Sequence, residues 1–198
     1  MNNSEIQKIL SKWEIKMSLD EILSRWSEPQ RHYHTQKHLE DLLTKINQRR
    51  SSLSVKDYEK LIIVALFHDI VYDPMSSTNE DDSGDMFIDK GYPNGYTPDE
   101  DIISKDDIDE IYQAIIDTKT HKATTFISKL FCDLDMSIVG GSYADLLEWE
   151  NGIYNEFKGY GSEAYKTGRL AFLKSLLDKY NGNADNLNKL ISWVEQNY

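Results

Sequence analysis

The sequence predicts an all-α fold, a helical bundle that forms one domain over residues 1–198. Apolar residues recur at three- and four-residue intervals in most segments, which is the period of an amphipathic helix. No segment alternates apolar with polar residues, as a half-buried strand does. Four prolines in 198 residues and an aromatic content of 11% also favour a folded, helical chain over a disordered one.

The first helices are marked by their N-terminal caps. Ser4 with Gln7 and Ser18 with Glu21 match the capping-box pattern, which predicts two helices within residues 4–26. After Pro29, a further helix is predicted from apolar residues at helical spacing, namely Leu39, Leu42, Leu43 and Ile46. Ser54 is the expected cap of a helix over residues 55–70, whose apolar character on all sides indicates a central, buried position.

The later elements follow the same pattern. A short helix is expected over residues 79–90, and turn residues dominate 91–104. The apolar spacing then predicts a helix from Ile108 to near the motif TKTH at 118–121, and another from Phe126 that reaches DLDMSIVGG at 133–141. Helices over 143–157, 164–180 and 186–196 complete the chain, with 4–26 and 186–196 expected to pack onto the central part.

Net charge and cysteine content exclude several classes of partner. A formal net charge of -12 repels phosphate backbones, so extended nucleic acid is not an expected partner. The longest apolar run, 61–67, is too short to span a bilayer, and no membrane partner is expected. The single Cys132 cannot form an intrachain disulfide, which suits a reducing compartment and predicts a cytoplasmic location.

One apolar run leads directly into a histidine and a carboxylate, in the sequence LIIVALFHDIVYDP at 61–74. Burying Asp69 costs several kcal/mol unless a partner offsets it, and a metal ion is a strong partner. His68 and Asp69 can lean from a helix end toward one point, which His38 and Asp135 could complete from other helices. The dipeptide alone is weak evidence, because five histidines and twenty aspartates give about 0.5 such pairs by chance. A surface His38 and an Asp135 paired with a lysine remain the alternative.

Several ordered motifs resemble a known family. The motifs are RHYHTQKH, ALFHDIVYDP followed by NEDD, DTKTH, DLDMSIVG and GRLAFLKSLL, which together span residues 31–177. This order resembles the HD-domain metal-dependent phosphohydrolases, and in particular a bacterial subgroup of small HD proteins. The resemblance implies an all-helical fold, a divalent metal ion and hydrolysis of a phosphate ester or anhydride.

The resemblance implies four metal ligands, His38, His68, Asp69 and Asp135. His34 and Asp133 are the competing residues within their clusters, and His32 is expected at the surface. Two imidazoles and two carboxylates suit one Mn²⁺, Fe²⁺, Co²⁺, Ni²⁺ or Zn²⁺, and Mg²⁺ is also considered. Two-metal relatives add two histidines between the dipeptide and the last aspartate, where this chain has only His121. A second ion would therefore require His34 or Glu80.

Further residues are assigned to catalysis and to substrate. Besides Asp69, the expected catalytic residues are Glu80 as general acid or base and Asp73, which could do the same or support a ligand histidine. The alternative for Glu80 is a helix-start residue capped by Thr78. The candidates for binding substrate are Lys119 with His121 as the preferred phosphate pair, then Arg31, Arg169, His34 and Tyr72.

The leading expectation is a phosphohydrolase that acts on a small phosphorylated metabolite or a nucleotide through metal-activated water. A non-catalytic sensor that binds metal and nucleotide is the first rival, and a di-iron oxygenase with the HD fold is the second. A homo-oligomer is left open as a partner. Each of these remains an expectation until the fold and the site are known.

Overall fold

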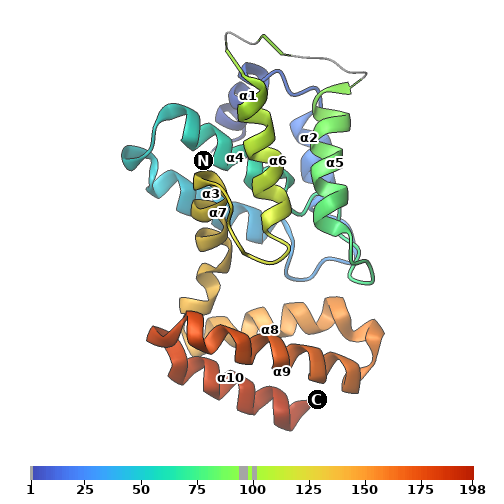
Figure 1. Cartoon of the computed structure of the whole chain (residues 1–198). Helices are drawn as coiled ribbons and strands as arrows, with labels where there is room; N and C mark the ends of the chain where they lie inside the picture. The colour runs from blue at the N-terminus through green and yellow to red at the C-terminus, as the bar shows by residue number, and fades with distance from the viewer. Residues whose placement is uncertain (1, 94–97, 100–101) are drawn as a thin grey trace. The chain divides into compact units, whose positions relative to one another are not determined.

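The computed structural model describes residues 2–93, 98–99 and 102–198, so parts of the predicted loop at 91–104 lie outside the described residues. Every regular element in the described chain is helical, which confirms the all-α prediction (Figure 1). The helices are α1 (Asn3–Lys12), α2 (Leu19–Arg25), α3 (Gln36–Gln48), α4 (Val55–Phe67), α5 (Asn79–Gly91), α6 (Lys105–Asp117), α7 (Phe126–Asp135), α8 (Tyr143–Phe157), α9 (Ser162–Lys179) and α10 (Ala184–Asn197). Short 3₁₀ turns occur at Arg50–Ser52, Met136–Gly140, Lys158–Tyr160 and Asn181–Asn183.

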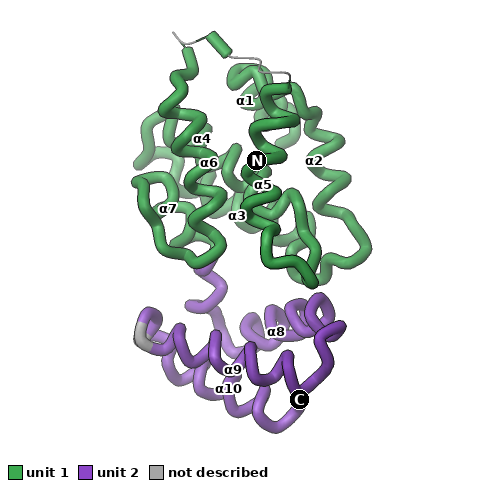
Figure 2. The backbone as a smooth tube through the Cα atoms, turned by 45° about the vertical axis from the view of Figure 1, so that its right-hand side comes forward, with its two compact units in different colours: residues 1–135 green, residues 136–198 purple. Residues whose placement is uncertain are grey.

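The chain divides into two compact units, unit 1 at Met1–Asp135 and unit 2 at Met136–Tyr198 (Figure 2). Each unit is described by itself below. The sequence predicted a single domain over 1–198, and that statement stays a prediction. Among the described residues, none of the helices has both the length and the apolar character that a membrane span requires.

Helix α4 is the centre of unit 1, as its composition predicted. Residues 61–67 are each no more than 1% exposed. Helices α1, α3, α5, α6 and α7 all pack against it. The helix ends at Phe67 rather than at the predicted Ile70, because the backbone tightens there into a turn in which Ile70 N–H donates to the Phe67 carbonyl at 3.2 Å. His68 and Asp69 therefore lie just beyond the helix. Successive side chains within a helix point about 100° apart, and these two are not held to that angle.

The capping predictions had mixed outcomes. The Ser18–Glu21 capping box is present at the start of α2. The Ser4–Gln7 box is wrong, because the cap of α1 lies two residues earlier, at Asn2, whose side chain accepts a hydrogen bond from Glu5 N–H at 2.9 Å. Ser54 caps α4 as predicted.

Unit 2 is made of helices α8, α9 and α10, which pack on one another. Its apolar core is supplied mainly by Leu146, Leu173, Leu187, Leu190 and Val194. A fully buried carboxylate, Glu150, accepts hydrogen bonds at 2.6 Å from both Tyr165 Oη and Arg169 Nε. The Arg169 guanidinium therefore neutralises the Glu150 carboxylate inside the unit, and the Tyr165 hydroxyl gives it a second hydrogen bond.

Candidate metal centre

Four side chains of unit 1 converge from three separate segments. His38 lies in the first turn of α3, His68 and Asp69 follow α4, and Asp135 is the last residue of α7. One ring nitrogen of His38, one of His68 and a carboxylate oxygen of Asp69 lie within 4.8 Å of one another. Oδ1 of Asp135 is 3.1 Å from His38 Nε2 and 3.9 Å from His68 Nε2. These are the four residues that the resemblance implied as ligands.

The competing residues lie elsewhere. Asp133 is largely exposed, and its carboxylate pairs with Lys129 at 3.0 Å on the same helix. His32 is exposed, as expected. His34 lies at the edge of the cluster, with its Nε2 3.8 Å from Oδ2 of Asp69. Burial thus separates the convergent aspartate from its neighbour two residues away.

The orientation of His68 is fixed by the end of α4. Its Nδ1 is 3.1 Å from the Ala65 carbonyl. A carbonyl can only accept a hydrogen bond, so Nδ1 carries a proton, and Nε2 is the nitrogen that faces the cluster and could bind a metal ion in exchange for its own proton. The Trp26 indole supports the same helix end by donating from Nε1 to the Leu66 carbonyl at 3.0 Å. Metal-binding histidines are typically held in this way by a carbonyl on the other nitrogen.

Two buried nitrogens of this cluster lack a hydrogen-bond partner. His38 Nε2 and His68 Nε2 are both inaccessible to solvent, and neither is satisfied by a hydrogen bond. Carboxylate oxygens do lie 3.1 Å from each nitrogen, but not in directions that form a hydrogen bond. An unsatisfied buried polar atom costs about 1–3 kcal/mol, so it calls for a missing partner. A cation among these atoms would satisfy both nitrogens, so the residues fit a divalent metal ion.

The charges of the cluster also favour a cation. Burial lowers the pKa of His68, but the negative charges of Asp69 and Asp135 outweigh it and raise that pKa to about 9. Burial raises the pKa of Asp69, but His68 and His34 outweigh it and hold it well below its usual range. Burial raises the pKa of Asp135, but the hydrogen bond from His121 and the nearby imidazoles of His38 and His68 outweigh it and hold that pKa well below its usual range. Both carboxylates are therefore anionic at neutral pH.

Two of the predicted substrate-binding residues instead flank the cluster. The His34 ring lies 4.4 Å from the Tyr72 ring, which is itself buried, and His34 faces Asp69. His121 Nε2 lies 3.0 Å from Oδ2 of Asp135. The sequence assigned His121 to phosphate only, and it missed this contact with the aspartate.

The predicted acid and base residues differ in their surroundings. Glu80 begins α5 and is partly buried; burial raises its pKa, and the negative charge of Asp69 raises it further. Thr78 does not cap the helix backbone but donates to Asp82. Asp73 closes a turn, since its carboxylate accepts from Met75 N–H at 2.9 Å and its own N–H donates to Asn79 at 3.0 Å. Both assignments to catalysis stay predictions.

The three basic candidates each contact a carboxylate. Arg31 is buried in unit 1, where it pairs with Glu28 at 3.3 Å and donates to the carbonyls of His34 and Ile70 at 3.2 Å. Lys119 pairs with Asp81 at 2.5 Å. In unit 2, Arg169 pairs with Glu150 at 2.6 Å, and its guanidinium lies 4.2 Å from the Trp149 ring centre. Arg31 therefore braces the loops on either side of the cluster.

Aromatic side chains line the buried side of the cluster. The rings of Trp26 and Phe131 lie 5.3 and 5.0 Å from the ring of His68. The Tyr33 ring lies 4.9 Å from that of His38. Helical spacing marks Trp26 and Phe131 as core residues, but it does not reveal which side chain of another helix an aromatic residue meets.

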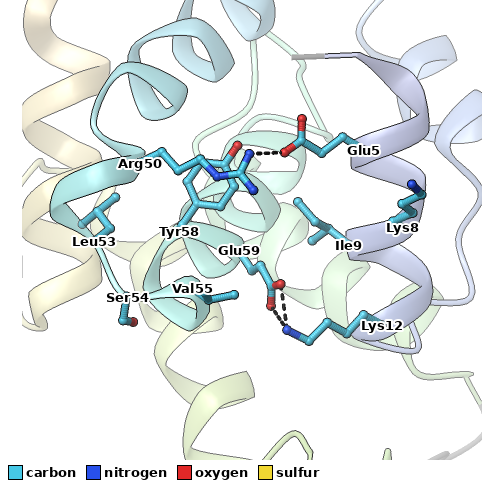
Figure 3. Close-up of a pocket in the computed structure, with 10 residues that line it drawn as sticks. All are labelled: Glu5, Lys8, Ile9, Lys12, Arg50, Leu53, Ser54, Val55, Tyr58 and Glu59. Atoms are coloured by element: carbon cyan, nitrogen blue, oxygen red, sulfur yellow. Dashed lines mark hydrogen bonds and ion pairs between the residues drawn. The ribbon is translucent and has the colours of Figure 1, made fainter.

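A separate cavity of about 290 Å³ lies between α1 and the start of α4 (Figure 3). It shares no lining residue with the cluster. Arg50 pairs with Glu5 at 2.5 Å, and Lys12 pairs with Glu59 at 2.7 Å (Figure 3). Four of the five charged side chains that line this cavity are thus paired with one another.

Comparison of the chain with protein-family models, with curated proteins and with solved structures found no match. The assignment of a function therefore depends on the residues of the cluster.

Proposed function

We propose that this protein is a metal-dependent phosphohydrolase of the HD-domain type, acting on a phosphate ester or anhydride of a small metabolite or a nucleotide. The observation that carries the proposal is the pair of buried, unsatisfied Nε2 atoms of His38 and His68, which meet the carboxylates of Asp69 and Asp135. Buried polar atoms usually have a hydrogen-bond partner, and a metal ion bound between the two nitrogens would supply the missing partner of both.

His38, His68, Asp69 and Asp135 would hold the ion. Two nitrogens and two oxygens suit Mn²⁺, Fe²⁺, Co²⁺, Ni²⁺ or Zn²⁺ rather than Ca²⁺, with Mg²⁺ as a further option, and leave coordination positions open. When bound, such an ion lowers the pKa of a water molecule toward neutrality and so provides a hydroxide nucleophile. The raised affinity of His68 for a proton means that metal uptake releases that proton to solvent.

The residues around the cluster would transfer a proton to the substrate and form the walls of the site. Glu80 is the candidate general acid, because burial and the negative charge of Asp69 both raise its pKa. Its carboxyl group would give a proton to the leaving oxygen. Trp26 and Phe131 exclude water from the buried side of His68. His34 against Tyr72 offers a flat surface at the edge of Asp69, which suits an organic group of the substrate.

One observation favours a second candidate, a non-catalytic sensor that binds metal and nucleotide. Arg31, Lys119 and Arg169 each contact a carboxylate, so none presents an unneutralised cation to a phosphate. In this second candidate the ion alone would bind the phosphate, without turnover. The cytoplasmic location and a homo-oligomeric state stay predictions under both candidates.

The test compares His68→Ala with His32→Ala, an exposed histidine of the α2–α3 connection. Each protein is loaded with Mn²⁺ or Co²⁺, analysed for metal, and assayed with nucleotides and a generic phosphate ester. The wild type and His32→Ala should bind one ion per chain and hydrolyse a substrate. His68→Ala should lose both while retaining helicity by circular dichroism.

The outcomes separate the candidates. A His68→Ala protein that retains metal at wild-type stoichiometry would contradict the centre. Metal and nucleotide binding without turnover under any metal would establish the sensor. Two irons per chain together with oxygen uptake would establish the oxygenase instead.

A further inference from the structure

The loop between α6 and α7 holds one residue in a strained backbone conformation. His121 has a φ of 52°, in the left-handed region that residues other than glycine seldom adopt. Such a residue costs of order 1–3 kcal/mol and persists only where its surroundings determine it, often at a functional site. The position of the His121 side chain is therefore imposed by the loop.

Hydrogen bonds fix both ends of that loop. Oδ2 of the buried Asp117, at the end of α6, accepts from Thr124 N–H at 2.7 Å and from Thr124 Oγ1 at 2.8 Å. Its other oxygen accepts from Gln113 Nε2 at 2.7 Å. On the α7 side, Ser128 Oγ accepts from the N–H groups of Thr124 and Thr125 at 3.0 Å. Asp117 thus ties the end of the loop back to α6.

The loop directs His121 at the outer oxygen of Asp135. Nε2 of His121 is 3.0 Å from Oδ2, whereas Oδ1 faces His38 Nε2 at 3.1 Å and His68 Nε2 at 3.9 Å. Because an ionised carboxylate only accepts, the His121 Nε2 must donate here. The two oxygens of Asp135 are therefore divided between the cluster and His121.

We propose that His121 is a positioning residue: by donating to Oδ2 of Asp135 it turns Oδ1 toward the metal ion of the proposed centre. Asp117 acts one step further out, by holding the loop that carries His121. This inference rests on the proposed function, and it replaces the direct phosphate contact expected from the sequence. Partners of this kind change metal affinity by roughly 10–100-fold.

The experiment measures Co²⁺ affinity by calorimetry and by the visible spectrum of the bound ion. Four variants are compared: His121→Gln, His121→Asn, His121→Ala and Lys122→Ala. Glutamine keeps a donor near the place of Nε2, whereas asparagine suits the left-handed backbone but is too short to reach. Lys122 is an exposed neighbour in the same loop and serves as the control.

The expected result is a loss of Co²⁺ affinity of roughly 10–100-fold in His121→Ala and His121→Asn. His121→Gln should stay close to wild type, and Lys122→Ala should not differ from it. At saturating Co²⁺, inorganic phosphate should bind all five proteins alike. Asp117→Ala should shift Co²⁺ affinity in the same direction by a smaller factor, and the His121 series decides the matter if Asp117→Ala does not fold.

Four outcomes would overturn the inference. Wild-type Co²⁺ affinity in His121→Ala with weakened phosphate binding would return His121 to a phosphate role. A fall from two ions to one would make it a ligand, and asparagine performing as well as glutamine would show that only the backbone matters. A wild type that binds no metal overturns both proposals, whereas metal binding without hydrolysis removes only the enzymatic function.

Discussion

Two regions of unit 1 bury carboxylates, and they differ in what neutralises them. Around the buried Lys60, the anions are Asp107 and Glu110, each 2.7 Å from its Nζ, and Lys56 adds a second contact to Asp107 at 2.5 Å. At the candidate metal centre, Asp69 and Asp135 instead face imidazoles. The first region balances two anions with two cations.

This difference in neutralising groups distinguishes buried charges that other side chains already balance from buried charges that a bound ligand would balance. A lysine remains protonated near neutral pH, so the cluster around Lys60 is complete as it stands. A histidine can exchange its proton for a metal ion, and two nitrogens at the candidate centre lack any hydrogen bond. Under the proposed function, carboxylates therefore serve stability in one region and metal binding in the other.

The comparison is tested most strongly by Asp107→Ala. This change leaves Lys60 buried with only Glu110, and removing one partner of a buried ion pair typically costs about 3 kcal/mol or more. The free energy of unfolding, measured with urea, should fall by about 3 kcal/mol. Metal uptake should be unchanged, because Asp107 does not belong to the candidate centre. If Asp107→Ala lost its metal while its free energy of unfolding stayed the same, the roles assigned to the two regions would be reversed.

Removing the metal should change only the part of the free energy of unfolding that comes from the candidate metal centre. At a free Mn²⁺ concentration of 100 times Kd, binding to the folded state adds about 2.7 kcal/mol to the free energy of unfolding. A chelator should remove this increment from wild type and from Asp107→Ala equally, as measured by thermal unfolding. In His68→Ala the chelator should have no effect. A wild-type Tm that does not respond to Mn²⁺ would contradict the comparison.

The ion pairs of Asp107 with Lys56 and Lys60 should also make the free energy of unfolding depend on pH. This effect should be smaller than the two above. Burial raises the pKa of Asp107, but hydrogen bonds from Lys56 and Lys60 outweigh it and hold that pKa well below its usual range. The unfolded chain therefore takes up a proton near pH 3.9, before the folded chain does. The stability from Asp107 is present above that pH and is lost as the pH falls below it toward the folded pKa.

Asp107→Asn cannot take up this proton, so its stability should depend less on acid. The advantage of wild type over Asp107→Asn should shrink by about 1 kcal/mol between pH 5 and pH 2.5, in urea titrations without metal. An advantage that stays constant or grows over this range would show that the lysines do not hold Asp107 in its ionised form.

The sequence by itself determined most of the helices and, through the resemblance, which four residues were expected to meet at the candidate centre. The uninterrupted apolar character of α4 requires burial on every side, which the structure confirms. The Ser18 cap acts within one turn of chain, so local sequence was enough to place it. Helix α7 instead ends at Asp135 and passes into the 3₁₀ turn Met136–Gly140, short of the end predicted near Gly140. The convergence of His38, His68, Asp69 and Asp135 was expected from the order of the motifs, although not from helix periodicity alone.

Only the tertiary structure decided the partners of the charged side chains. It paired His121 with Asp135, Lys119 with Asp81, and Lys60 with Asp107 and Glu110. Such pairs depend on the relative rotation and translation of two helices, which the pattern within either helix does not contain. Local spacing fixes the face on which a residue lies, but only packing fixes what that face meets, and this separates a completed ion cluster from one that fits a metal.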